Sequence, residues 1–204
     1  MIRRQYQKIM ALFYDPFMDS LEKELIHHRR YLINQIDKGP VLEVGAGTGV
    51  NFDLYPPNIE VYAIEPSTPM YKKALKRIKN KPHIHLYNIS LEELDKQKEI
   101  PAKFAYILST LVLCTIKDPE KGAQIYHRLL EDNGKLLVLE HIHSGETFYG
   151  KFQKWINPLW KPLADGCNLI RRQDKILKNK GFVAIREKYF KLGTLWYRAV
   201  MKKS

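Results

Sequence analysis

A glycine-rich turn that follows a short apolar run constrains this chain more than any other feature. Residues 41–52 read VLEVGAGTGVNF, with glycines at positions 45, 47 and 49 and a carboxylate, Glu43, inside the apolar run. Because glycine has no side chain and tolerates left-handed backbone angles, such a turn lets a ligand approach the backbone closely. The stretch predicts a ligand-binding turn at the end of a strand.

Strand-like and helix-like segments alternate after this turn. Strands are expected at residues 40–44, 61–65, 83–88, 104–110, 135–142, 183–190 and 195–201. Helices are expected at residues 68–80, 117–131 and 168–182, and also between residues 3 and 36. This alternation predicts an α/β domain with a mostly parallel sheet, right-handed crossovers and a ligand site at the carboxyl edge of the sheet.

Length and composition limit the class of protein. The 204 residues contain no internal repeat and no Ser/Gly-rich linker, which favours one domain. Two cysteines, Cys114 and Cys167, are too few for a disulfide framework and suit a reducing compartment. Neither a secretory signal nor a membrane-spanning apolar run is evident, so a soluble, cytoplasmic protein is expected.

The formal net charge of +12 favours anionic partners. The basic residues are spread along the chain, so this charge does not choose among nucleic acid, phospholipid and an acidic metabolite. The interleaved aromatic and basic residues typical of RNA binding are missing, and nucleic acid is not an expected partner.

Two ligand classes compete for the glycine turn. A dinucleotide fingerprint would need glycine or alanine at position 50, which is Val50. Glu65, twenty residues after Gly45, ends the next expected strand and can accept hydrogen bonds from ribose hydroxyls in either class. Glu43 separates the classes, since a carboxylate at the turn repels a pyrophosphate and attracts a cationic ligand.

The motif E-V-G-A-G-T-G after an apolar strand, with an acid ending the next strand, resembles class I S-adenosylmethionine-dependent methyltransferases. The resemblance implies an α/β fold with a Rossmann-like sheet, an antiparallel last strand, helices on both faces and an N-terminal helical lid. It divides a single domain into a lid segment at 1–36, a cofactor-binding core at 37–145, and a substrate-side insert with a C-terminal hairpin at 146–204. The implied cofactor is S-adenosylmethionine, whose sulfonium and ammonium groups suit Glu43, and the implied product is S-adenosylhomocysteine.

In this family the glycine turn passes under the methionine and ribose part of the cofactor, and the acid of the second strand binds the ribose. Residues after the third strand meet the adenine, and the end of the fourth strand faces the methyl group. The matching cofactor-binding positions here are Glu43, Gly45, Ala46, Gly47, Gly49, Asn51, Glu65, Pro66, Asn88, Ile89, Ser90, Ser109 and Thr110. Asn88 stands where the family commonly has aspartate, and its carbonyl oxygen can still accept a hydrogen bond from the adenine amine.

Two further stretches, STLVLCTIKDPEKGAQIYHRLLEDNGKLLVLEHI and NPLWKPLADGCNLIRR, resemble the group that includes thiol S-methyltransferases and are also similar to phospholipid and quinone methyltransferases. A small or lipophilic acceptor is expected, with a thiol slightly favoured. One alternative is a phospholipid or quinone methyltransferase in peripheral contact with an anionic membrane, and another is a cofactor-binding protein without turnover. The sequence leaves the acceptor and the oligomeric state open.

Candidate catalytic residues are His141, Tyr14 and Asp165. Candidate acceptor-binding residues are Tyr14, Leu111, His143, Trp155, Trp160 and Asn168. No metal site is expected, because His141 and His143 have no third ligand nearby along the chain. Cys114 and Cys167 are expected to be small buried residues, and Glu140 is expected to face away from His141 by strand alternation.

Overall fold

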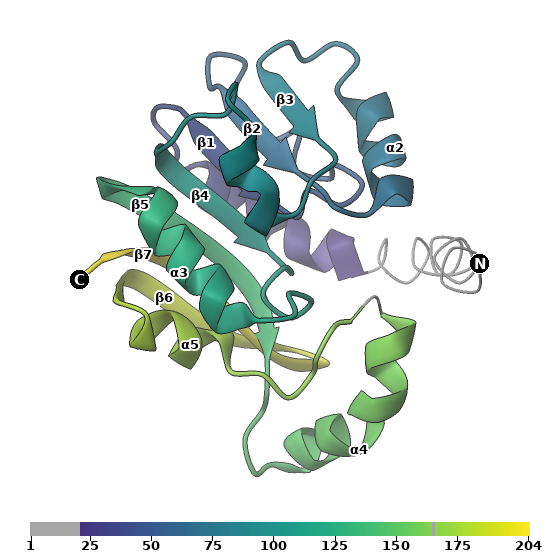
Figure 1. Cartoon of the computed structure of the whole chain (residues 1–204). Helices are drawn as coiled ribbons and strands as arrows, with labels where there is room; N and C mark the ends of the chain where they lie inside the picture. The colour runs from purple at the N-terminus through teal and green to yellow at the C-terminus, as the bar shows by residue number, and fades with distance from the viewer. Residues whose placement is uncertain (1–20, 165) are drawn as a thin grey trace.

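The computed structural model describes residues 21–164 and 166–204. Its centre is a seven-stranded sheet in the order β3-β2-β1-β4-β5-β7-β6 (Figure 1). The strands are β1 (Val41–Val44), β2 (Val61–Ile64), β3 (Ile84–Tyr87), β4 (Phe104–Thr110), β5 (Leu130–Ile142), β6 (Phe182–Leu192) and β7 (Thr194–Lys203). The pairs among β1 to β5 are parallel, whereas β7 runs antiparallel to both β5 and β6. The expected Rossmann-like sheet with an antiparallel last strand is confirmed.

Helices cover both faces of this sheet, as expected (Figure 1). Tyr126 and Leu177 belong to the core on one face, and Leu25 and Leu32 belong to the core on the other. The helical segments are residues 21–33, α2 (Thr68–Arg77), the 3-10 helix η1 (Leu91–Lys96), α3 (Pro119–Leu129), α4 (Phe148–Leu163) and α5 (Gln173–Asn179). Of the expected lid segment, residues 1–20 lie outside the described residues.

The order in which successive strands are added to the sheet reverses between β1 and β4. β1 pairs with both β2 and β4, so Val44 lies opposite Ile64 and Ser109. The residues that follow each strand, including Gly45 and Glu65, therefore emerge side by side at the carboxyl edge. Open α/β sheets bind their ligands at such a switch point.

The expected boundary between α3 and β5 is wrong. The helix ends at Leu129, and the residues from Leu130 to Gly134 belong to β5. Leu130 adopts extended angles and pairs with Phe104 at the start of β4. A Cβ atom on Gly134 would lie 2.8 Å from Leu130 Cδ1 and 2.9 Å from the Ala105 oxygen, so glycine serves here as a strand residue in close packing rather than as a helix stop.

Helix α4 is not predicted by the sequence pattern. It contains Pro158 and Pro162, and proline lacks the N–H group that an interior helical position donates. The Thr147 side chain caps its first turn by accepting the Gly150 N–H at 3.2 Å. Among the described helices, none combines the length and apolar character that crossing a bilayer requires.

Helix α5 begins at Gln173, five residues later than expected. The preceding residues are bound to the loop after β4. Arg171 donates to the carbonyl oxygens of Leu113 and Cys114 at 2.8 and 2.9 Å, and Asn168 N donates to the Cys114 oxygen at 2.9 Å. These tertiary hydrogen bonds keep residues 168–172 out of the helix.

Candidate functional site

The glycine turn after β1 has left-handed backbone angles. Gly45, Gly47 and Gly49 have φ angles of 64°, 59° and 80°. A Cβ atom on Gly45 would lie 2.7 Å from Val112 Cγ2, and one on Gly49 would lie 2.6 Å from the Phe52 ring. A Cβ atom on Gly47 would meet no described atom within 4 Å. The turn is therefore packed at its two ends and open at its middle.

Glu65 is oriented beside the open middle of this turn. Its Oε2 accepts the Gly47 N–H at 2.8 Å, and its Oε1 accepts the Ser67 N–H at 2.7 Å. Asn88 Nδ2 donates to the Glu65 carbonyl at 2.7 Å, and Asn88 Oδ1 accepts from Thr68 Oγ1 at 3.0 Å. Through its carboxylate and its backbone carbonyl, Glu65 thus links the ends of β1, β2 and β3.

The other residues predicted to bind the cofactor near β1, β2 and β3 differ in their exposure and in their partners. Ala46 is buried, Pro66 is exposed, and Ile89 packs partly against the core on the α3 face. Ser90 forms a capping box for η1, in which its hydroxyl donates to Glu93 Oε2 at 2.8 Å. The Ser90 side chain thus already has a structural partner.

Glu43 lies fully buried beneath the turn in a hydrogen-bonded network. Its Oε1 accepts from Asn51 Nδ2 at 2.9 Å and its Oε2 from the Tyr55 hydroxyl at 2.8 Å. Arg29 Nη1 donates to Asn51 Oδ1 at 3.2 Å and to Thr110 Oγ1 at 2.7 Å. The network connects the helical residues 21–33 to the turn and to the end of β4.

Burial raises the pKa of Glu43 to about 7, against the opposing hydrogen bonds from Asn51 and Tyr55 and the charge of Arg29. Burial also raises the pKa of Tyr55 well above its ordinary value, and the neighbouring Glu43 raises it further. A cation bound near the turn would favour the ionised form of Glu43. Binding of such a cation would therefore favour proton release from Glu43.

The last residues of β4 divide between the two faces of the sheet. Ser109 Oγ lies 3.1 Å from the Tyr126 hydroxyl of α3, so this side chain points away from the turn. Thr110 points the other way, into the Glu43 network. Leu111 follows with a φ angle of 63°. Such an angle in a residue other than glycine costs about 1–3 kcal/mol and is concentrated at functional sites.

A second polar cluster forms where the loop after β4, the end of β5 and the segment after α4 meet. One ligand-type atom from each of Cys114, His141 and Cys167 lies within 4.8 Å of the others. His141 Nε2 is 3.0 Å from Cys167 Sγ, and its ring packs edge-on against Trp196. The hydrogen bond with Cys114, followed by the contact with His141, lowers the pKa of Cys167, and the same bond together with burial raises the pKa of Cys114.

Glu140 points to the other face of β5, as expected from strand alternation. Its Oε1 accepts the N–H groups of Val112 and Leu113, both at 2.8 Å. Burial raises the pKa of Glu140 to about 7, although the charge of His141 and the two backbone N–H groups act in the opposite direction. This carboxyl group fixes the start of the loop that carries Cys114.

The histidine pair considered in the sequence does not form. His143 Nε2 lies 3.1 Å from the Gly150 carbonyl oxygen, outside the cysteine cluster, whereas His141 belongs to that cluster. Cys114 and Cys167 approach His141 from distant segments, which spacing along the chain does not reveal.

The other candidate acceptor-side residues are only partly brought together. Trp160 lies next to Cys167 and helps to lower the pKa of that thiol. Trp155 is 71% exposed on α4. Tyr14 and Asp165 lie outside the described residues.

Arg29 and Tyr55 belong to the Glu43 network but are missing from the predicted site. Arg29 lies four residues after Leu25 and three before Leu32, so helical spacing places it on the inward face. A basic residue on an apolar helical face is the signal that could have identified it. No comparable pattern marks Tyr55.

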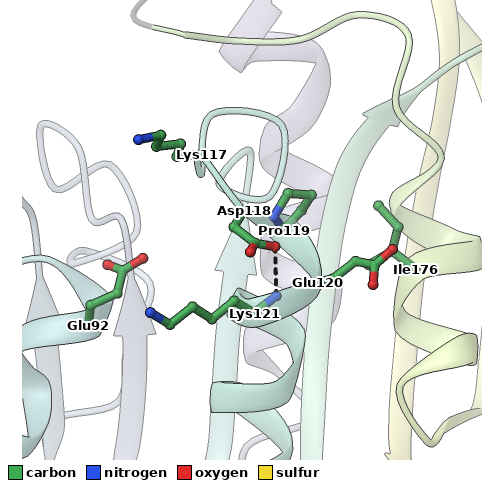
Figure 2. A pocket seen from close by; sticks show the side chains of 7 residues that line it. All are labelled: Glu92, Lys117, Asp118, Pro119, Glu120, Lys121 and Ile176. Atoms are coloured by element: carbon green, nitrogen blue, oxygen red, sulfur yellow. Dashed lines mark hydrogen bonds between the residues drawn. The ribbon is translucent and has the colours of Figure 1, made fainter.

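A surface hollow beside the start of α3 carries both acidic and basic side chains (Figure 2). Glu92, Asp118 and Glu120 line it together with Lys117 and Lys121. Asp118 Oδ1 accepts the Lys121 N–H at 3.0 Å and caps the helix. Because charges of both signs are mixed and the helix start has its own cap, this hollow favours no class of ligand.

Sequence and structure comparisons relate this chain to known methyltransferases. The sequence pattern of the methyltransferase-domain family matches residues 15–186. Thiol S-methyltransferase TMT1A of Homo sapiens is 28% identical over 188 residues, covering 91% of this chain and 77% of that protein. Thiol S-methyltransferase TMT1B of Homo sapiens is 30% identical over 174 residues, covering 83% and 70%. The structure of Burkholderia thailandensis 1,6-didemethyltoxoflavin-N1-methyltransferase, with bound 1,6-didemethyltoxoflavin and S-adenosylhomocysteine, shares the fold with a TM-score of 0.72 at 13% identity, covering 100% of this chain and 87% of that one.

The two glycines at the middle and end of the turn should differ in their tolerance of a side chain. Both adopt positive φ angles, but only at Gly49 would a Cβ atom collide, at 2.6 Å, with the buried Phe52 ring. We expect Gly49→Ala to lower the free energy of unfolding by about 1–3 kcal/mol more than Gly47→Ala, because overpacking a buried ring adds to the backbone strain. Urea unfolding of the two variants measures the difference, and equal losses would contradict the packing described here.

Glu43→Gln should flatten the pH dependence of stability. The folded-state pKa of Glu43 is about 7, above the 4.5 of an exposed glutamate, so the folded protein keeps a proton that the unfolded chain loses. This group therefore lowers the free energy of unfolding as pH rises from about 4.5 to about 7, by at most roughly 3–4 kcal/mol at about 1.4 kcal/mol per pKa unit. Urea unfolding across this range tests the change. The exposed Glu24→Gln controls for the loss of one carboxylate, and a Glu43→Gln profile parallel to the wild type would refute the effect.

Proposed function

Because this chain belongs to the methyltransferase-domain family, we propose that it transfers the methyl group of S-adenosylmethionine to the sulfur of a small or lipophilic thiol. The observation that carries the cofactor assignment is the pairing of Gly47 with Glu65. A turn that is open at its middle lies beside an oriented carboxylate, at the switch point of a parallel sheet.

In this proposal the turn from Gly45 to Gly49 passes under the methionine and ribose part of the cofactor. The Glu65 carboxylate accepts hydrogen bonds from the ribose hydroxyls. Two backbone N–H groups already fix its orientation, and each carboxylate oxygen can accept more than one hydrogen bond. Asn88, held against the Glu65 carbonyl, lies where the adenine is expected.

Glu43 acts through its charge rather than by direct contact. Its oxygens are bound by Asn51 and Tyr55, so the sulfonium and ammonium groups are attracted across the turn. The cationic cofactor and the ionised carboxylate stabilise each other, which suits a group whose pKa is about 7 when no cation is present.

The thiol acceptor rests on the chemistry of the step and on the similarity to two thiol S-methyltransferases. The acceptor sulfur forms a bond to the methyl carbon as the bond from that carbon to the sulfonium breaks, giving a thioether and S-adenosylhomocysteine. The thiol proton passes to solvent. A thiol with a pKa near 8.5 is partly ionised at neutral pH, so positioning supplies much of the rate and no dedicated base is required. Candidate His141 is therefore not needed as a general base.

Glu65→Ala is expected to weaken binding of S-adenosylmethionine about tenfold or more, because hydrogen bonds to a charged group contribute about 1.5–3 kcal/mol. Glu60→Ala is the matched control, since Glu60 is an exposed glutamate at the opposite end of the same strand. Calorimetric titration measures both affinities, and circular dichroism checks the fold. An unchanged affinity in a folded Glu65→Ala protein would exclude the proposed cofactor role.

The acceptor is tested by incubating the protein with methyl-labelled S-adenosylmethionine and two acceptor sets in parallel. One set contains small thiols, and the other contains vesicles of phosphatidylethanolamine with anionic lipid. We expect label in a thioether product. Label in lipid alone, or no transfer to thiols by a protein that binds the cofactor, would refute the thiol acceptor.

A further inference from the structure

Two cysteines and a histidine converge at the carboxyl edge of the sheet from three distant segments. Cys114 lies in the loop after β4, His141 near the end of β5, and Cys167 in the segment after α4. Their ligand atoms lie within 4.8 Å of one another. These are the only cysteines in the chain, and the proposed methyl transfer uses neither of them.

We propose that Cys114, His141 and Cys167 bind one Zn²⁺ ion through three protein ligands, leaving one coordination position open. Tetrahedral zinc with Zn–S distances of about 2.3 Å and Zn–N distances of about 2.0–2.1 Å separates its ligand atoms by about 3.5–3.8 Å. The observed spacing reaches that arrangement with small side-chain movements, chiefly an opening of the 3.0 Å contact between His141 Nε2 and Cys167 Sγ.

The chemistry of these side chains selects the class of metal. Sulfur and imidazole ligands favour zinc or a similarly soft ion, whereas calcium and magnesium prefer oxygen. Cys114 and His141 are 2% and 5% exposed, so a bound ion would be shielded from water on the protein side. Two thiolates and a neutral imidazole would balance the charge of Zn²⁺, which makes the assembled site electrically neutral.

The backbone that carries the ligands is already held in place. The Asn168 N–H donates to the Cys114 oxygen at 2.9 Å, and the Cys167 N–H donates to the Ala164 oxygen at 2.8 Å. Arg171 binds the Cys114 oxygen as well, at 2.9 Å. These bonds position the backbone that carries the ligands, and the ion would tie the segment after α4 to the ends of β4 and β5.

The test uses the full chain, stripped of metal under reducing conditions and then titrated with zinc chloride. We expect one tightly bound Zn²⁺ per wild-type chain and loss of this stoichiometric binding in Cys167→Ser and His141→Ala. His143→Ala is the matched control, because His143 lies two residues from His141 but faces the Gly150 carbonyl oxygen, and it should bind zinc as the wild type does.

Cobalt substitution of the wild type gives a readout that does not depend on any variant folding. A thiolate-to-cobalt charge-transfer band with the intensity of a tetrahedral site is expected, and it should disappear on addition of zinc. No stoichiometric zinc binding by the reduced wild type, a cobalt spectrum without thiolate bands, or zinc binding that survives in folded Cys167→Ser would each overturn the proposal.

Discussion

The parallel pairing of β1 with β2 on one side and β4 on the other is the constraint on which the site depends. This register places Val44 beside Ile64 and Ser109, so that the three following loops start at one level. The carboxylate of Glu65 then reaches the Gly47 N–H, which links the turn to the neighbouring strand. A slip of one residue would reverse every side chain of β1 between the faces and remove Glu43 from its partners.

Two buried carboxyl groups, Glu43 and Glu140, support the loops at this edge. Burying a charged group is unfavourable unless hydrogen bonds or opposite charges compensate, and burial accordingly raises both pKa values to about 7. Glu43 is bound by side chains beneath the first turn, whereas Glu140 is bound by the backbone of the loop after β4. Glu43 would be stabilised in its ionised form by a neighbouring cation, which the proposed cofactor would supply.

Local sequence rules failed where tertiary contacts compete with them. The Asp132–Gly134 stretch has the composition of a helix stop, yet pairing of Leu130 with Phe104 draws this stretch into β5. The two prolines of α4 argue against a helix, but Thr147 caps its first turn. Arg171 belongs to an apparently helical run, and its bonds to the loop after β4 delay the start of α5. At β5 and α5 a contact between distant residues outweighs a local preference of about 1 kcal/mol per residue, whereas the cap of α4 is itself local.

By itself, the sequence determined the α/β class, the order of the strands along the chain, the left-handed glycine turn and the acid that ends β2. Those features are encoded by periodicity and by residues whose backbone preferences act locally. Only the tertiary structure decided that Tyr55 binds Glu43 and that Arg29 joins the same network through Asn51. It also decided that Ser109 points toward α3 and not toward the turn, and that Cys114, His141 and Cys167 form one cluster. Such contacts join residues up to 81 positions apart, as Arg29 and Thr110 show. They depend on strand order and register within the sheet, which no short stretch of sequence encodes.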